Sequence, residues 1–171
     1  MYLQDMIKDD QKREILLEKE VDFVVVNISS KSDLEGRLDD LDESIDDSHQ
    51  IFVMDNGELE LARRRGTKVI ENLDDSGAEM FNQGMMRGVG KYICFLFSSI
   101  SINKDWLTPL LSEIKKPGIG MVIPQLAPTE DEEEEKQIPV LLLKREVLPR
   151  VGPFDEKLSF NLKDLDFELR L

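Results

Sequence analysis

The stretch IFVMDNGELELARRRGTKVIENLDDSGAEMFNQGMMRGVGKYICFL, residues 51–96, carries the clearest fold signal in the chain. It holds three short apolar runs, and segments of helical composition connect them. Short apolar runs that alternate with helices are typical of βαβ units and a parallel sheet. Ligands of such sheets bind at the carboxyl ends of the strands. The sequence therefore predicts a binding site at Asp55 and at the residues directly after Leu96.

The segments on either side of this stretch continue the alternation. Val21–Asn27 is a nearly continuous apolar run rich in β-branched residues, which predicts a first strand buried on both faces. Further strands are expected at Ile119–Ile123 and Val140–Leu143. Helices are expected around Leu34–Leu41, from Ser76 to about Arg87, around Trp106–Ile114 and at Leu162–Leu171. Residues 1–20 fit an amphipathic helical lead-in, which leaves residues 21–171 as the main α/β domain.

The composition argues against several classes of function. The chain of 171 residues has a formal net charge of −14, which argues against nucleic-acid binding because phosphate contacts need clustered basic residues. The cluster Arg63–Arg65 stands at a predicted helix end, where cations complement the helix dipole. The acidic run Glu130–Glu135 predicts a solvated loop and not a calcium site. No apolar run approaches the ~18 residues of a membrane span.

The single cysteine and the single histidine give no sign of a catalytic or metal centre. Cys94 lies inside an apolar run, so no disulfide framework exists and a buried thiol in a reducing compartment is expected. A cytoplasmic location follows from this interpretation. His49 has no second His or Cys near it in the sequence, so we expect an exposed loop residue there and not a base or a ligand.

The residues Asp55 and Asn56 and the helix glycines Gly77 and Gly84 each have two interpretations. Each either contacts a ligand or serves only the fold. Asp55 and Asn56 follow a strand, where such residues contact a ligand or cap the next helix. Gly77 and Gly84 lower the helix propensity of their segment. Glycines of this kind indicate close approach of a ligand or another backbone, or tight packing on the sheet. The local sequence leaves these alternatives open.

A series of motifs in matching order resembles the family 2 inverting glycosyltransferases. These motifs include IFVMDNG, the helix motif Gly-x-x-x-x-Asn-x-Gly, the strand GKYICFL, the segment LLLKREVLPRVGPFDE and the end KDLDFELRL. The resemblance covers about Val21–Leu171. It implies a three-layer α/β/α domain with a mostly parallel sheet, which is the nucleotide-diphospho-sugar transferase-like (GT-A) fold.

The resemblance also implies roles for individual residues. In the family, an Asp at the end of the second strand contacts the nucleotide base, and Asp55 stands at that place, followed by Asn56. Four positions of the helix motif and the next strand match as well: Gly77, Asn82, Gly84 and Gly90. The implied ligand is a nucleotide-diphosphate sugar.

The metal motif is where the sequence departs most from the family. Family members hold a divalent metal with an acidic motif directly after the fourth strand, where this chain has Phe97, Ser98 and Ser99. Hydroxyls supply too little charge for Mg²⁺ or Mn²⁺, and the metal normally offsets the charge of the leaving diphosphate. Asn27–Ser29 also replaces the usual Thr-Tyr-Asn. The sequence therefore predicts no bound metal and impaired catalysis, with Ser98 and Ser99 as candidate substrate contacts.

The C-terminal motif keeps one catalytic feature. Family members carry Glu-Asp-x-Asp, whose first Asp removes the proton of the acceptor hydroxyl, and Asp164 is the matching candidate base. Lys163 replaces the Glu; it either acts as a cation near the diphosphate or is a surface lysine, and the surface role is favoured because one flexible ammonium substitutes poorly for a bridging ion. Family members commonly continue beyond this motif, so the domain is expected to be a fragment or to lack its acceptor side.

Three functions remain open from the sequence. The first is an active glycosyltransferase with an unusual donor site. The second is a non-catalytic pseudo-glycosyltransferase domain that binds a protein partner or a sugar nucleotide. The third is a related nucleotidyltransferase, which would need a Gly-rich basic loop after the first strand, and Ser29–Ser32 is not one. The sequence favours impaired catalysis on a glycosyltransferase-like domain.

Overall fold

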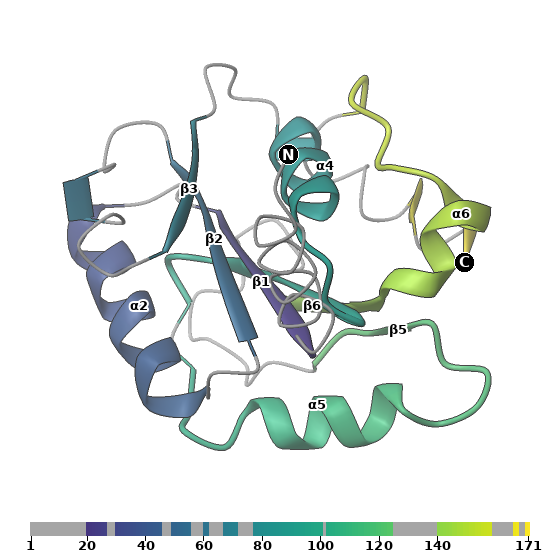
Figure 1. Ribbon diagram of the computed structural model, residues 1–171, viewed down its shortest axis with the longest axis horizontal. Coiled ribbons are helices and arrows are strands. Elements are labelled where there is room, and N and C mark those ends of the chain that lie inside the picture. Colours follow the sequence, from purple (N-terminus) through teal and green to yellow (C-terminus); the bar gives the residue numbers. More distant parts are fainter. Residues whose placement is uncertain are drawn as a thin grey trace, which may run out of the picture.

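The computed structural model of the chain describes residues 20–26, 30–45, 49–55, 60–61, 67–71, 77–100, 102–124, 140–158, 166–167 and 170–171 (Figure 1). Several sequence predictions lie outside these residues: the helical lead-in, Asn27–Ser29, Asn56, Arg63–Arg65, Glu130–Glu135, Lys163 and Asp164.

Six strands of the described residues form one mixed sheet in the order β3-β2-β1-β4-β6-β5. The strands are β1 (Val21–Val26), β2 (His49–Asp55), β3 (Lys68–Glu71), β4 (Tyr92–Phe97), β5 (Met121–Val122) and β6 (Val140–Lys144). The first four run parallel to one another, whereas β6 is antiparallel to β4 and β5 is antiparallel to β6. The predicted mostly parallel sheet is confirmed.

Helices cover both faces of this sheet. They are α2 (Lys31–Ser44), α4 (Gly77–Arg87), α5 (Leu107–Ile114), the 3-10 helix η1 (Arg145–Val147) and α6 (Leu148–Val151) (Figure 1). The buried side chains of α2 and α5 share one core with Val21, Phe23 and Val25. Those of α4, η1 and α6 share the other core with Val24 and Val26. The chain is therefore the three-layer α/β/α sandwich that the sequence predicts.

β1 lies in the middle of the sheet, and all of its side chains are buried. Its odd-numbered residues face one core and Val24 and Val26 face the other, because successive side chains of a strand alternate between faces. A strand covered on both faces needs apolar residues at nearly every position. Asp22 is the exception, since it is fully buried in this strand.

The Asp22 carboxylate is satisfied by groups from three other segments. Oδ2 accepts hydrogen bonds from the Gly90 amide at 2.7 Å and from Nη2 of Arg145 at 2.7 Å. Oδ1 accepts one from Nε2 of Gln50 at 3.2 Å. A buried carboxylate without such partners would be strongly unfavourable. The cluster lies at the amino ends of the parallel strands, at the opposite edge from the predicted site.

Two local predictions are refined by the structure. α2 begins after Ser30, whose hydroxyl accepts a hydrogen bond from the Asp33 amide at 3.2 Å. α5 begins at Leu107, one residue after the start of the expected range Trp106–Ile114, and Trp106 is its N-cap residue. Helix boundaries are the least predictable part of a helix, because helix ends fray over one or two residues.

The expectation that His49 is an exposed loop residue is wrong. His49 is the first residue of β2 and is only partly exposed. Its ring lies 5.5 Å from the ring of Phe23 on the neighbouring strand, measured between centroids. The contact with the neighbouring strand partly shields the imidazole from solvent. The sequence around His49 shows no alternation of apolar and polar residues, so it did not predict a strand there.

Cys94 lies in β4 and is a buried free thiol, as predicted. Burial raises the pKa of this thiol above its usual range, so it stays protonated in the folded chain. In the part of the chain that the structure describes, no helix has the length and apolar character needed to cross a membrane.

Candidate functional site

The candidate site lies where β1, β2 and β4 end. Val26 of β1 pairs with Met54 of β2 and with Phe97 of β4. Asp55 and Ser98 therefore lie one residue further along, on either side of the position that follows β1. Two strand spacings separate them, which places their Cα atoms roughly 10 Å apart. The predicted meeting of these residues at one edge of the sheet is consistent with the observed register.

Asp55 and Ser98 also approach from the same side of the sheet. Asp55 follows Val53 by two residues, and Ser98 follows Leu96 by two residues; both apolar residues belong to the core under α2 and α5. Their side chains are nearly covered, with 2% of Asp55 and 1% of Ser98 exposed. The Ser98 amide donates a hydrogen bond to the Val26 carbonyl at 3.0 Å, which extends the ladder beyond β4.

Ser99 is exposed beside this pair. The edge thus offers one buried carboxylate, one buried hydroxyl and one exposed hydroxyl. A carboxylate is an acceptor for N–H and O–H groups of a ligand, and a hydroxyl both donates and accepts. This set is suited to hydrogen bonding of a polar ring or a sugar.

The same residues do not fit a divalent cation. Phe97 points into the core on the α4 side, with its ring 5.8 Å from that of Phe81 between centroids, so it offers nothing to a metal. Ser98 and Ser99 are neutral oxygen donors, whereas Mg²⁺ and Mn²⁺ favour carboxylates. Among the described residues, no group of three or more His, Cys, Asp and Glu side chains could hold a metal ion.

Asn82 lies apart from Asp55 and Ser98. It belongs to α4, which covers the opposite face of the sheet, and it is 6% exposed. Its Oδ1 accepts a hydrogen bond from the Phe154 amide at 2.9 Å. Its Nδ2 donates to the Phe154 carbonyl at 3.0 Å and to Oε1 of Glu156 at 2.9 Å. The structure thus places the side chain of this sequence-predicted residue against the segment Phe154–Glu156.

The glycines of α4 and of the segment before β4 have packing roles where the structure describes their surroundings. A Cβ on Gly84 would overlap both methyl groups of Val24 in β1. The amide of Gly90 binds Asp22, and a Cβ there would lie 3.0 Å from the Asp22 amide nitrogen. Tight packing on the sheet therefore explains Gly84 and Gly90. Gly77 is the first residue of α4.

Arg170, in the described part of the C-terminal motif, contacts the segment Val151–Pro153. Nη2 of Arg170 forms an ion pair with Oδ2 of Asp166 at 2.7 Å. Arg170 also donates hydrogen bonds to the carbonyls of Val151 and Pro153, at 2.6 and 2.9 Å. Sequence reasoning missed these roles of Arg170. The spacing of four residues between Asp166 and Arg170 was the available signal for their pairing.

The amino end of α2 is closed by its own side chains. The Asp33 carboxylate accepts a hydrogen bond from the Ser30 amide at 3.1 Å, in return for the bond from the Asp33 amide to the Ser30 hydroxyl. Phosphate groups bind helix amino ends through free amides and a favourable dipole. The Asp33 carboxylate already occupies the amino end of α2, and its negative charge disfavours a phosphate at this helix end.

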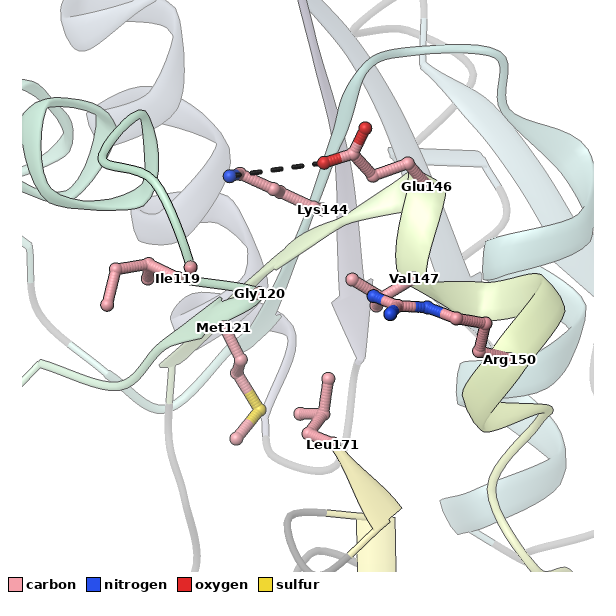
Figure 2. A pocket seen from close by; sticks show the side chains of 9 residues that line it. Ile119, Gly120, Met121, Lys144, Glu146, Val147, Arg150 and Leu171 are labelled. Carbon is pink, nitrogen blue, oxygen red and sulfur yellow. Dashed lines mark ion pairs between the residues drawn. The ribbon is translucent and has the colours of Figure 1, made fainter.

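A separate cavity of about 400 Å³ lies at the β5 edge of the sheet (Figure 2). It is lined by Gly118, Ile119, Gly120, Met121, Lys144, Glu146, Val147, Arg150 and Leu171. Lys144 pairs with Tyr92 at the start of β4, so the cavity lies towards the amino ends of the parallel strands. Nζ of Lys144 lies 4.0 Å from Oε1 of Glu146. This cavity is not part of the Asp55 and Ser98 edge.

No protein-family model matches the chain, and no curated protein matches it. Solved structures do match it. The crystal structure of S. aureus TarS 1–349 in complex with UDP gives a TM-score of 0.68 at 16% identity and covers 89% of this chain. The structure of the same TarS fragment in complex with UDP-GlcNAc gives a TM-score of 0.66 at 16% identity and covers 88% of this chain.

A CMP:2-keto-3-deoxy-manno-octonic acid synthetase complexed with CTP also matches, with a TM-score of 0.60 at 13% identity over 90% of this chain and 85% of that one. The chain has the nucleotide-diphospho-sugar transferase-like (GT-A) fold. It spans about half of the TarS 1–349 chains, 55% and 54% of their lengths, and 34% of a longer TarS chain.

The GT-A fold makes the carboxyl edge of the sheet the candidate ligand site. In open α/β sheets, ligands bind outside the carboxyl ends of the strands, where the strand order reverses. In this chain β2 and β3 are added on one side of β1 and β4 on the other, so the reversal point lies between β1 and β4. Ser98 borders that point, and Asp55 ends β2, the next strand on the other side of β1. The fold predicted from the sequence is confirmed.

Proposed function

We propose that the chain is a family 2-like glycosyltransferase domain that binds a nucleotide-diphosphate sugar at the Asp55 and Ser98 edge, with impaired glycosyl transfer to an acceptor. The observation that carries the proposal is the position of Asp55, a buried carboxylate at the end of β2, the strand next to β1 at the carboxyl edge of a GT-A sheet. The structural neighbours crystallised with UDP and UDP-GlcNAc support this choice of ligand.

Asp55 is suited to read the base of the donor. Its carboxylate accepts hydrogen bonds only, and uracil and guanine both present N–H donors at their edges. A charge-assisted hydrogen bond in a covered place is stronger than a neutral one. The Ser98 hydroxyl, across the end of β1, is the proposed contact for the ribose or the first phosphate oxygen.

Transfer of the sugar requires a base and compensation of charge on the leaving group. Asp164 is the proposed base: it takes the proton of the acceptor hydroxyl while that oxygen bonds to the anomeric carbon and the bond to the diphosphate breaks. The nucleoside diphosphate leaves with the electron pair of that bond. Serines in place of acids at Ser98 and Ser99 leave this charge without a metal, so we propose slow transfer.

Calorimetry with UDP- and GDP-sugars, with and without Mn²⁺, tests the donor site. We expect binding that Mn²⁺ does not strengthen, and a loss of binding of at least about tenfold in Asp55→Ala, as for a charge-assisted hydrogen bond. Asp105→Ala, which removes an exposed carboxylate elsewhere, is the matched control. Equal affinity of the Asp55→Ala and wild-type chains would contradict the proposed donor site.

The alternative function is a non-catalytic module for a protein partner. It is favoured by the same serines, because a domain that has lost its metal ligands is free to keep the fold for binding alone. Absence of both donor binding and UDP release from UDP-sugars under every metal condition would favour this alternative.

A further inference from the structure

The cavity at the β5 edge of the sheet has no part in the proposed function. Its volume of about 400 Å³ is within the range of pockets that bind small molecules, roughly 300–1,000 Å³. β5, β6, η1, α6 and the segment after α5 all contribute residues to its wall. Every residue that lines it belongs to the described part of the chain.

Two cations and one acid stand among the residues that line this cavity. Lys144 comes from β6, Arg150 from α6 and Glu146 from η1, which joins these two elements (Figure 2). Two positive charges and one negative charge leave the cavity with a formal charge of +1, whereas the whole chain has −14. A local positive site on an acidic chain attracts an anion.

The ammonium group of Lys144 has few partners within the protein, although only 16% of its side chain is exposed. Nζ donates one hydrogen bond, to the Lys116 carbonyl, at the long distance of 3.4 Å. It lies 4.0 Å from Oε1 of Glu146, beyond hydrogen-bond distance. An ammonium carries three N–H donors, so this largely buried group is able to bind a further acceptor in the cavity.

Arg150 supplies a second cation at the same cavity. Its side chain is exposed, and with the described residues it forms neither an ion pair nor a hydrogen bond. Figure 2 shows its guanidinium beside Val147. A planar guanidinium binds the two oxygens of a carboxylate in a bidentate arrangement. Arg150 is therefore suited to a carboxylate ligand.

The rest of the wall is apolar or consists of glycine. Met121 of β5 and Val147 of η1 lie on it together with Ile119 and Leu171 (Figure 2). An ion without an apolar part would leave these side chains in water, whereas an apolar chain removes them from it. A methionine side chain also adapts its shape to what it contacts. The cavity thus favours a ligand with both an anionic group and an apolar chain.

We propose that this cavity binds a small organic acid, with its carboxylate held by Lys144 and Arg150 and a short apolar chain against Met121 and Val147. Glu146 selects for a single negative charge, because it repels ligands that carry more. The site lies towards the amino ends of the parallel strands, at the opposite edge from Asp55. It is therefore separate from the proposed donor site and does not depend on it.

Titration with octanoate, followed in amide NMR spectra of the isotope-labelled chain, tests the site. We expect saturable shifts at the amides of Gly118, Gly120 and Lys144, which border the cavity. Acetate carries the charge without the chain, and octylammonium carries the chain with the opposite charge. Each is expected to bind at least about tenfold more weakly than octanoate, because each lacks one of the two interactions.

Substitution of the exposed charges separates this site from a general effect of net charge. Arg150→Gln should weaken octanoate binding by about fivefold or more, the effect of losing a charge-assisted hydrogen bond. Glu146→Gln removes the repelling acid and should strengthen binding by about twofold or more. Arg87→Gln and Asp105→Asn are the matched controls, because they remove exposed charges that do not line the cavity. They should change the dissociation constant by less than about 1.5-fold.

Four results would overturn the proposal. The first is the absence of saturable shifts up to about 20 mM octanoate. The second is octylammonium binding as tight as that of octanoate, since the cations would then not select the ligand. The third is an equal effect of Arg150→Gln and Arg87→Gln on octanoate binding. The fourth is octanoate shifts at Asp55 and Ser98 without shifts at the cavity. None of these measurements uses a nucleotide sugar, so their outcome is independent of the proposed function.

Discussion

Asp22 and Arg145 form an ion pair that the strand pattern does not predict, in which the carboxylate is fully buried and the guanidinium is partly exposed. They are 123 positions apart in the sequence, and Asp22 interrupts a run that is otherwise apolar. Arg145 also donates hydrogen bonds to the carbonyls of Gly90 and Met85, at 2.6 and 2.7 Å. One guanidinium thus joins the end of β6, the start of β1 and the end of α4.

Removal of this guanidinium is expected to destabilise the fold strongly. Arg145→Ala leaves the fully buried Asp22 carboxylate without its charged partner, which costs about 3 kcal/mol of unfolding free energy or more. Arg150→Ala removes an exposed arginine nearby and should change stability by less than about 0.5 kcal/mol. Urea unfolding of the two variants checks this, and equal midpoints would contradict it.

Cys94 gives the stability of the chain a pH dependence. Burial raises the pKa of its thiol, while the thiol of the unfolded chain titrates near ~8.5. Below that pH both states keep the proton. Above it only the unfolded state loses the proton, so stability falls with rising pH, by up to ~1.4 kcal/mol per pH unit.

The measurement is the unfolding free energy of wild type and Cys94→Ala from about pH 7 to about pH 10, the range in which a free thiol titrates. The difference between the two chains should narrow as pH rises, because the alanine variant has no thiol to titrate. A difference that is constant across this range would show that the Cys94 thiol does not contribute.

α4 and β1 approach one another closely because α4 carries glycine where it crosses the strand. The sequence leaves two explanations for Gly84, a ligand or packing, and only the contact with Val24 distinguishes them. A Cβ atom on Gly36 of α2 would meet nothing within 4 Å, so Gly36 makes no such close approach. The two glycines make a natural comparison.

Opposite effects are expected for the same substitution in these two helices. Gly84→Ala forces the added methyl group into Val24 and should cost about 1–3 kcal/mol. Gly36→Ala adds a methyl group in open space within a helix and should stabilise by about 0.5–1 kcal/mol. Thermal unfolding of both variants checks the signs, and stabilisation by Gly84→Ala would show that α4 moves away from β1 without penalty.

Apolar periodicity predicted most elements, because each strand and helix here buries a face that its own sequence reveals. Leu34, Leu38 and Leu41 are all buried, as their spacing indicates. Asp55 and Ser98 were also predicted to share an edge, since chain order in a parallel sheet places strand ends together. Contacts between distant segments were not predictable: the bonds from Asn82 to Phe154 join positions 72 apart.

The net charge of −14 affects how the whole molecule meets an anionic ligand. A nucleotide sugar approaches against a repulsive field, and salt screens that field over about 10 Å at ~0.1 M ionic strength. We therefore expect the affinity for UDP-GlcNAc to rise by about twofold or more between about 20 mM and about 200 mM NaCl. Calorimetry at the two salt concentrations checks this.

The opposite dependence has a specific meaning. An affinity that falls with salt would indicate that a local cation dominates the interaction with the diphosphate. Lys163 is the candidate in that case, and Lys163→Gln should then remove the salt dependence, whereas Lys157→Gln, an exposed lysine in the described part of the chain, should not.

β4 lies between β1 and β6 in the sheet, but during synthesis β1 is available for pairing before β4 and β6 only afterwards. The four parallel strands are complete once Phe97 has left the ribosome, but β6 begins only at Val140. Until then β4 presents an unpaired edge made of Tyr-Ile-Cys-Phe-Leu-Phe, the kind of segment that pairs with other chains. A nascent or prematurely ended chain therefore exposes a strand edge that is prone to aggregation. Antiparallel pairing of β6 with β4 covers this edge.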